Sequence, residues 1–185
     1  HCISSAASDV YKRQVILVSA PTSLPIPSGV DFISVDSAVS MQEAVEARYN
    51  DVNVVIMAAA VSDFRVLHKA EQKIKKMESM TIELVKNPDI LQGLGSKKSH
   101  QILVGFAAET EHVIKYGQDK VAKKNLDMLV ANDVSKSNAG FNVDTNEGYF
   151  LYPDKEPKEI PNMKKSDLAR HILREVIDLV ANKHS

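Results

Sequence analysis

A run of small residues followed by acidic and basic side chains is the part of this sequence best suited to chemistry. A short apolar stretch ends in three alanines, Ala58, Ala59 and Ala60, and Asp63 and a lysine cluster beginning at Lys73 follow. Alanines let a ligand approach the backbone, and an acid with several lysines could handle a metal-bound phosphate chain. The alternative is a core strand followed by a solvated loop, because charge runs are usually solvated faces.

Two other apolar stretches end in a similar way, at GFAAET (residues 105–110) and at VANDVS (residues 130–135). Ligands of open α/β sheets bind outside the carboxyl ends of the strands. Three such ends in one expected sheet indicate a shared crevice at that edge. The alternative is that small residues simply ease tight turns between strands and helices.

Two lysines, Lys120 and Lys124, are four residues apart on an expected helix and therefore share a face. Paired cations suit a triphosphate, whose charge builds up on the departing pyrophosphate; a solvated pair beside Asp119 is the alternative. The sequence contains no Walker phosphate loop, no G-x-G-x-x-G and no H-E-x-x-H. A hydrolase triad of Ser62, Asp63 and His68 is disfavoured because Ser62 lacks a G-x-S-x-G elbow.

The elements that must position these residues alternate between strands and helices. Apolar runs predict strands at residues 15–18, 30–35, 53–59, 80–85, 102–106 and 126–131. Helical spacing predicts helices at residues 38–49, 111–125 and 166–181, the first capped by Ser37. A short helix through residue 94 is expected to have Asn87 as its cap and Pro88 at its first position.

This order indicates an α/β fold with a doubly wound, mostly parallel sheet and right-handed crossovers. Residues 144–148, DTNEG, predict a hairpin turn, with a return strand at residues 149–152. This late β-hairpin is expected to be an appendage that packs on the domain or on a second subunit, because two strands alone are marginally stable.

Length and composition limit the function classes. The 185 residues suit one domain, and a net charge of −1 gives no global field that would attract nucleic acid. The longest apolar run, residues 54–61, is too short to span a membrane. One cysteine, Cys2, allows no intrachain disulfide, and a cytoplasmic setting is expected. Residues 1–14 do not match the rest and are interpreted as an extraneous or truncated lead before a domain of residues 15–185.

Several motifs occur in an order that carries a family resemblance. They are MAAAVSDFR, KIKK, ELVKNPDIL, GFAAET, KVAKKNLD, VANDVS and GFNVDTNE. Together they resemble phosphopantothenate–cysteine ligase, the synthetase domain often fused behind a flavin-dependent decarboxylase in the bacterial bifunctional coenzyme A flavoprotein. The resemblance covers about residues 15–180 and implies a nucleotide-binding, Rossmann-like domain.

The resemblance implies a two-step reaction. Cytidine triphosphate (CTP) activates the carboxylate of 4′-phosphopantothenate as an acyl-cytidylate and releases pyrophosphate. The cysteine amine then attacks the acyl carbon and expels cytidine monophosphate. Catalysis of this kind needs positioning and charge stabilisation rather than a protein nucleophile. Mg²⁺ is implied by the triphosphate, whereas FMN would belong only to an upstream decarboxylase domain in a bifunctional parent.

The resemblance also implies roles for particular residues. Lys73 would be the catalytic residue that stabilises charge on the α-phosphate, and the backbone of Ala58 to Ala60 would form the crevice wall. The residues implied at the nucleotide are Asp63, Lys73, Asn87, Pro88, Asp89, Ile90, Phe106, Lys120 and Lys124. The region of residues 140–152 would help to form a homodimer.

The sequence departs from the family at its start. The family opens with a strand and a glycine-rich phosphate-binding loop ahead of the position of Val15, and residues 1–14 do not match them. We therefore expect these 185 residues alone to be inactive or nearly so. Two other hypotheses are a nucleotide- or NAD-binding module without ligase activity and a structural or dimerisation fragment.

Overall fold

The computed structural model describes residues 14–76, 78–135 and 144–183. Its largest sheet has the strand order β3-β6-β7-β8-β9, in which β3, β6 and β7 are parallel and β8 and β9 are antiparallel additions. These strands are β3 (Val54–Met57), β6 (Ile102–Glu109), β7 (Met128–Asp133), β8 (Thr145–Leu151) and β9 (Lys158–Lys164). The expected α/β class, with parallel strands at the centre, is confirmed.

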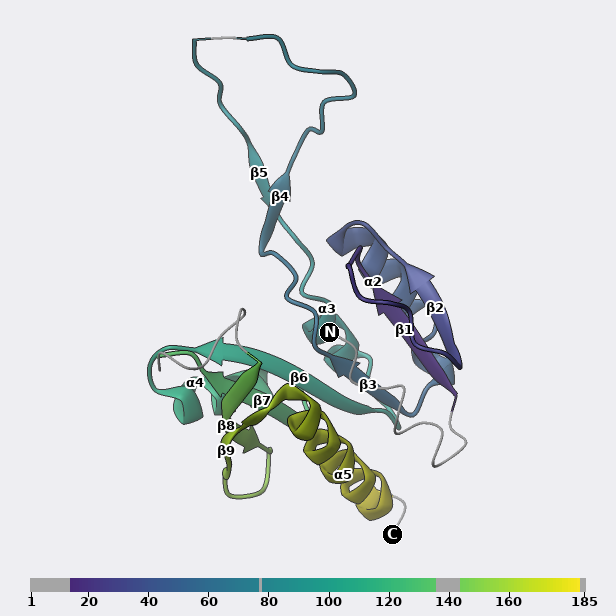
Figure 1. Cartoon of the computed structure of the whole chain (residues 1–185), viewed down its shortest axis with the longest axis vertical. Helices are drawn as coiled ribbons and strands as arrows, with labels where there is room; N and C mark the ends of the chain where they lie inside the picture. The colour runs from purple at the N-terminus through teal and green to yellow at the C-terminus, as the bar shows by residue number, and fades with distance from the viewer. Residues whose placement is uncertain (1–13, 77, 136–143, 184–185) are drawn as a thin grey trace.

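A second parallel pair, β1 (Val15–Ser19) and β2 (Val30–Ser34), lies beside this sheet without hydrogen-bonding to it (Figure 1). Among the described strands, β1 pairs only with β2, and β3 pairs only with β6. Val18 of β1 and Val55 of β3 nevertheless pack against the same apolar core. Among the described residues, the parallel layer is therefore interrupted between β1 and β3, and neither strand has a pairing partner at that edge.

In the described part of the chain, four helices and one 3-10 turn cover the two sheet faces. They are α2 (Ala38–Glu46), η1 (Tyr49–Asp51), α3 (Ile90–Ser96), α4 (Val113–Lys123) and α5 (Lys165–Lys183). Successive strand residues point to opposite faces. Leu103 accordingly packs with the core under α2, α3 and α4, and Val104 packs with the core under α5. Figure 1 shows α5 on its own side of the sheet.

Two helix starts test the expected caps. Ser37 caps α2 and forms a capping box with Ser40, as expected. Asp89, not Asn87, caps α3, and its carboxylate accepts a 3.0 Å hydrogen bond from the Gln92 amide. The expected cap at Asn87 is wrong because its side chain is 8% exposed and its amide is bonded elsewhere.

The late hairpin differs from expectation in the position of its turn. Residues 145–148 belong to β8, and the chain reverses between Leu151 and Lys158. Gly148, at φ +156°, lies so close to β7 that a Cβ atom would be 2.0 Å from the Ala131 carbonyl oxygen. The hairpin extends the main sheet through β7, and β9 tolerates Pro161 because it is an edge strand.

A two-stranded ribbon, β4 (Phe64–Val66) and β5 (Leu84–Lys86), extends away from the body and carries residues 67–83 at its end (Figure 1). We call residues 64–86 the arm. The strand expected at residues 80–85 is wrong in extent, because β5 covers only Leu84–Lys86. Chain-local patterns could not locate this ribbon, because its pairing joins residues about twenty positions apart.

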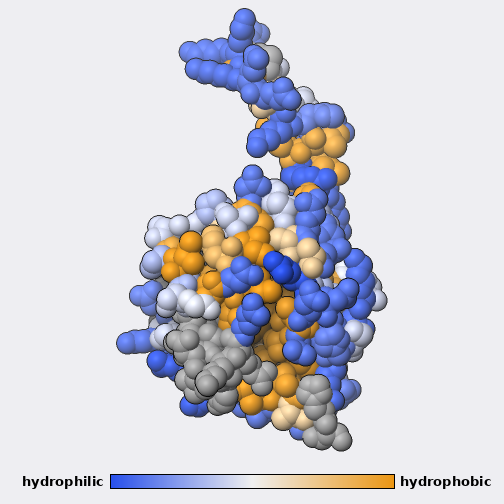
Figure 2. Space-filling model, turned by 90° about the vertical axis from the view of Figure 1, so that its right-hand side faces the viewer, coloured by the Kyte–Doolittle hydropathy of each residue, from blue (hydrophilic) through white to orange (hydrophobic). Residues whose placement is uncertain are grey.

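One face of the arm is apolar and uncovered. Val66 and Leu84 are direct cross-strand partners, and their side chains are 43% and 57% exposed. Phe64 is 56% exposed on the same strand. Figure 2 shows apolar side chains along the ribbon and polar ones at its tip. Within the described ranges, no helix is long and apolar enough to cross a bilayer.

Candidate functional site

A hydrogen-bond network joins the chain after β3 to the start of α3. The Asn87 amide N–H donates to the Asp63 carbonyl at 2.7 Å, and the Asn87 side-chain amide donates to the Ser62 carbonyl at 2.9 Å. Arg65 donates from Nη1 to Asn87 Oδ1 at 3.1 Å and to the Lys86 carbonyl at 3.0 Å. Two motifs about twenty residues apart in the chain, SDFR and KNPD, thus form one structural unit.

Asp89 and Lys124 connect this unit to α4. Lys124 Nζ lies 3.0 Å from Asp89 Oδ2, and the two side chains are partly exposed. Partial burial raises the pKa of the Asp89 carboxyl, but the Gln92 N–H and Lys124 outweigh it, so the pKa lies below its ordinary value. Asp89 is therefore a charged carboxylate at neutral pH that holds Lys124 over the start of α3.

A second ion pair joins Lys120 of the same helix to Glu109. Glu109 is the last residue of β6, and Lys120 reaches it from α4. Both lysines expected at phosphates are thus held by carboxylates near the carboxyl end of the sheet. A phosphate chain bound here would compete with Asp89 and Glu109 for the two ammonium groups.

The other residues expected at the site differ in how exposed they are. Ala58 to Ala60 follow β3 at its carboxyl end, as expected, with Ala59 and Ala60 exposed. Pro88 is half-buried next to Asn87, whereas Ile90 is only 4% exposed and belongs to the core. The side chain of Ile90 therefore packs in the core, and its backbone belongs to the unit around Asn87.

Phe106 and Lys73 are not brought to the two lysines. Phe106 packs against the core on the α5 side, whereas its neighbour Ala107 packs on the α4 side. Lys73 is exposed and belongs to the loop between β4 and β5, and this loop forms the far end of the arm (Figure 1). In this single chain, the expected catalytic lysine therefore lies away from the residues around Asn87.

Two residues that contact the expected site residues, Glu109 and Arg65, were not among those expected. Glu109 is the fifth residue of the quoted motif GFAAET, so its position near a strand end was the available signal. Arg65 offered no comparable signal, because its role depends on a contact with Asn87 that local patterns do not predict.

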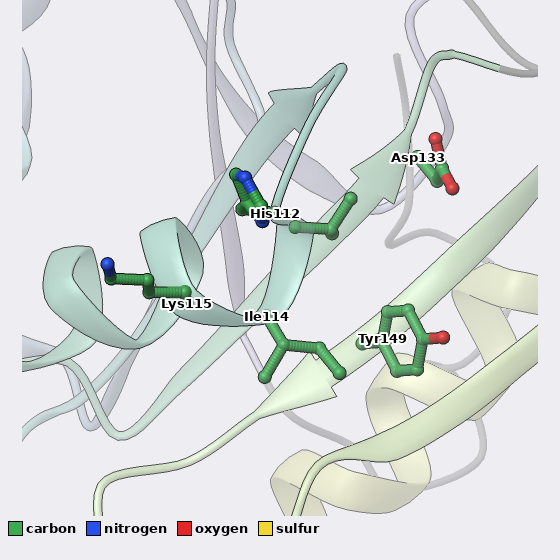
Figure 3. A pocket seen from close by; sticks show the side chains of 6 residues that line it. His112, Ile114, Lys115, Asp133 and Tyr149 are labelled. Carbon is green, nitrogen blue, oxygen red and sulfur yellow. The ribbon is translucent and has the colours of Figure 1, made fainter.

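A hollow of about 430 Å³ lies elsewhere on the same sheet edge (Figure 3). His112, Val113, Ile114, Lys115, Asp133 and Tyr149 line it. None of the expected site residues is among them. Ile114 and Tyr149 contribute apolar surface to its wall, and His112 and Lys115 are the basic side chains that line it.

Comparison with known families gives a clear result. The family model described as the DNA/pantothenate metabolism flavoprotein C-terminal domain matches residues 2–180. The chain belongs to this family. The resemblance stated from the motifs is thereby confirmed at the level of the family.

Curated relatives of this family are similar over nearly the whole chain. The coenzyme A biosynthesis bifunctional protein CoaBC of Bacillus subtilis is 45% identical over 97% of the chain and 44% of the relative. The protein of the same name from Escherichia coli K12 is 42% identical over 94% of the chain and 44% of the relative. The chain thus spans less than half the length of the curated relatives it matches.

Solved structures of this family share the fold. The crystal structure of the C-terminal domain of CoaBC matches with a TM-score of 0.80 at 36% identity, over 96% of this chain and 80% of that one. The DNA/pantothenate metabolism flavoprotein from Streptococcus pneumoniae matches with a TM-score of 0.73 at 17% identity, over 92% of this chain and 83% of that one. The second match shows similarity of fold alone.

Proposed function

We propose that the protein containing this chain is a phosphopantothenate–cysteine ligase of coenzyme A biosynthesis. The reaction joins 4′-phosphopantothenate to cysteine, uses CTP and proceeds through an acyl-cytidylate. Its main support is the unit around Asn87, Asp89 and Lys124, which gathers three of the motifs at one place. The similarity to the bifunctional proteins of Bacillus subtilis and Escherichia coli supports the same reaction.

In this mechanism the chain acts by binding and orienting charge. Lys120 and Lys124 leave their carboxylate partners to bind the phosphates, and the turn at residues 87–90 positions the nucleotide. The ammonium of Lys73 stabilises charge on the α-phosphate when the arm approaches the site, and the cysteine amine then attacks the acyl carbon. Preorganised cations at developing charge are the largest catalytic contribution expected of such a site.

Mg²⁺ would be held mostly by the substrate. Within the described residues, no group of three or more metal-binding side chains occurs. Mg²⁺ commonly binds one or two carboxylates together with substrate phosphates, and Asp63 is the carboxylate that fits this role. When bound, the ion would neutralise charge on the triphosphate. FMN is expected only in an upstream decarboxylase domain, and we propose a cytoplasmic setting.

We also propose that the protein is a homodimer. Part of the region first expected at the interface, residues 140–143, lies outside the described residues. The uncovered face of Phe64, Val66 and Leu84 gives the proposal better support, because a two-stranded ribbon with exposed apolar side chains is marginally stable alone. A second copy of the chain would supply the same face and bury both.

The edges of β1 and β3 that pair with no other described strand bear on activity. We propose that the 185 residues alone have little turnover, and that the strand and glycine-rich loop with which the family domain opens fit between these edges. We call a chain lengthened by that strand and loop the extended chain. It would complete both the sheet and the phosphate-binding wall.

Calorimetry and pyrophosphate release test the function. The 185-residue chain should bind CTP with magnesium and show no binding of NAD, which separates the ligase from an NAD-binding module. The extended chain should release pyrophosphate only with 4′-phosphopantothenate present. Binding of NAD but not of CTP would contradict the proposed CTP site. Rapid turnover by the 185 residues alone would contradict the proposal that this chain needs the family's opening strand and glycine-rich loop for activity.

A further inference from the structure

Arg65 lies at the root of the arm, where β4 and β5 leave the body. Its Nη1 atom donates to the Lys86 carbonyl at 3.0 Å and to Asn87 Oδ1 at 3.1 Å. Lys86 is the last residue of β5, and Asn87 is the next residue in the chain. One guanidinium group therefore spans both strands of the arm and holds the start of the turn that leads to Asp89.

The side chain of Asn87 is the contact through which Arg65 can act. It is buried, and its two ends face different partners: Oδ1 faces Arg65, and Nδ2 donates to the Ser62 carbonyl at 2.9 Å. A guanidinium can only donate hydrogen bonds, so Arg65 fixes which end of the amide is the oxygen. The other end must then face the Ser62 carbonyl, which can only accept.

This orientation fixes the spacing of the site. The backbone N–H of Asn87 donates to the Asp63 carbonyl at 2.7 Å, so the segments around Asp63 and Asp89 are held together. Asp89 in turn caps α3 and pairs with Lys124. A change at Asn87 would therefore be transmitted to the lysine expected at the phosphates.

We propose that Arg65 is a positioning residue for the nucleotide site. It fixes the orientation of the Asn87 amide and the angle at which the arm leaves the body, and with it the path by which Lys73 approaches. Arg65 itself touches neither nucleotide nor acyl group in this role. The proposal rests on the proposed function, because it assigns Arg65 to the same CTP site.

Arg65→Gln and Arg65→Lys separate this role from a general loss of stability. We expect Arg65→Gln to weaken CTP binding at least tenfold while its circular dichroism stays that of the wild type. Lysine keeps the charge but offers a compact donor rather than a planar fork. Arg65→Lys should therefore weaken CTP binding only two- to fivefold. Arg170→Gln is the matched control, because Arg170 pairs with Asp167 at 2.8 Å on the exposed side of α5.

Amide hydrogen exchange gives a readout that does not depend on nucleotide. The Asn87 amide should exchange at least tenfold faster in Arg65→Gln than in the wild type, and its rate should not change in Arg170→Gln. Should Arg65→Gln fail to fold, the same exchange measurement is made on Arg65→Lys, where a smaller acceleration is expected.

The outcomes distinguish this inference from the proposed function. Equal CTP affinity in the wild type and Arg65→Gln, or unchanged exchange at Asn87, overturns the positioning role and leaves the ligase proposal standing. A wild-type chain that binds no CTP overturns the proposed nucleotide site. In that case the exchange rates still decide whether Arg65 holds Asn87.

Discussion

Lys124 and Asp89 join the end of one helix to the beginning of another. Lys124 is the C-terminal cap of α4, Asp89 is the N-terminal cap of α3, and their charged atoms are 3.0 Å apart. The pair brings together two motifs, KNPD and KVAKKN, that are more than thirty residues apart. In the proposed function, an incoming phosphate would replace the Asp89 carboxylate as the partner of this ammonium group.

Replacement of Lys124 should affect binding more than stability. We expect Lys124→Gln to weaken CTP binding about tenfold, or about 1.4 kcal/mol. The partly exposed pair with Asp89 should contribute less than about 1 kcal/mol to folding. Titration calorimetry and urea unfolding measure the two effects. Lys115→Gln is the control, because Lys115 is on the same helix but lines the hollow near Tyr149. A larger loss of CTP affinity in Lys115→Gln than in Lys124→Gln would place the nucleotide site at that hollow.

Two glycines of α3 should respond oppositely to alanine. A Cβ atom on Gly95 would lie 1.9 Å from the Lys124 carbonyl oxygen, which belongs to the backbone and cannot rotate away. Gly95→Ala should therefore cost at least about 1–3 kcal/mol of stability. The nearest atom to a Cβ on Gly93 is Glu46 Oε1 at 4.0 Å. Gly93→Ala should gain up to about 1 kcal/mol from helix propensity.

Urea unfolding of both glycine variants checks this contrast. Similar free energies of unfolding for Gly95→Ala and Gly93→Ala would show that α3 and the end of α4 are not in close contact. A reduced affinity of Gly95→Ala for CTP is also expected, because separation of the helices would move Lys124 from Asp89.

Lys73 should matter for turnover rather than for folding. In the extended chain, Lys73→Gln should lower the rate of pyrophosphate release about 10²–10³-fold, as removal of one preorganised donor does elsewhere. Lys69→Gln, an exposed lysine on the same loop, should change the rate less than about threefold. Unchanged turnover in Lys73→Gln would favour a structural or dimerisation role for the arm.

The apolar face of the arm should control association. Val66→Glu should shift the chain from dimer to monomer in light scattering coupled to size-exclusion chromatography, because a buried unpaired carboxylate is costly. Leu24→Glu, at a leucine that is 49% exposed away from the arm, should leave the mass unchanged. A monomeric wild type at all concentrations would contradict the proposed dimer.

Acid should weaken the contact between the hairpin and α5. Glu175 accepts hydrogen bonds from Tyr152 at 2.6 Å and from Lys158. Partial burial raises the pKa of Glu175, but Lys158 and Tyr152 outweigh it and hold the pKa below its ordinary value. A carboxylate whose pKa is lower in the folded than in the unfolded protein stabilises the fold. This stability is fully present above the pKa of the unfolded state, near 4.3, and is lost as the pH falls through the pKa of the folded state.

Thermal unfolding from pH 7 to pH 3 measures this dependence. Glu175→Gln should flatten the acid side of the stability curve relative to the wild type. Glu156→Gln, an exposed residue in the turn between β8 and β9, should keep the wild-type slope. Equal slopes for the wild type and Glu175→Gln would show that the carboxylate contributes no pH-dependent stability.

The sequence alone determined the alternation of the parallel strands with the helices, the apolar faces and the family motifs. Periodicity is a local property, so α2, α5 and the parallel strands could be predicted from neighbouring residues. The lysine pair on one helix face followed from a spacing of four residues, and the acidic ends of β6 and β7 were visible as strand ends.

Only the tertiary structure decided which of these residues meet. Asn87 is engaged by Arg65 and the Ser62 carbonyl, which leaves capping of α3 to Asp89. The arm forms because β4 pairs with a distant β5, and this pairing carries Lys73 away from the body. Such contacts depend on partners far apart in the chain, and local propensity holds no information about them.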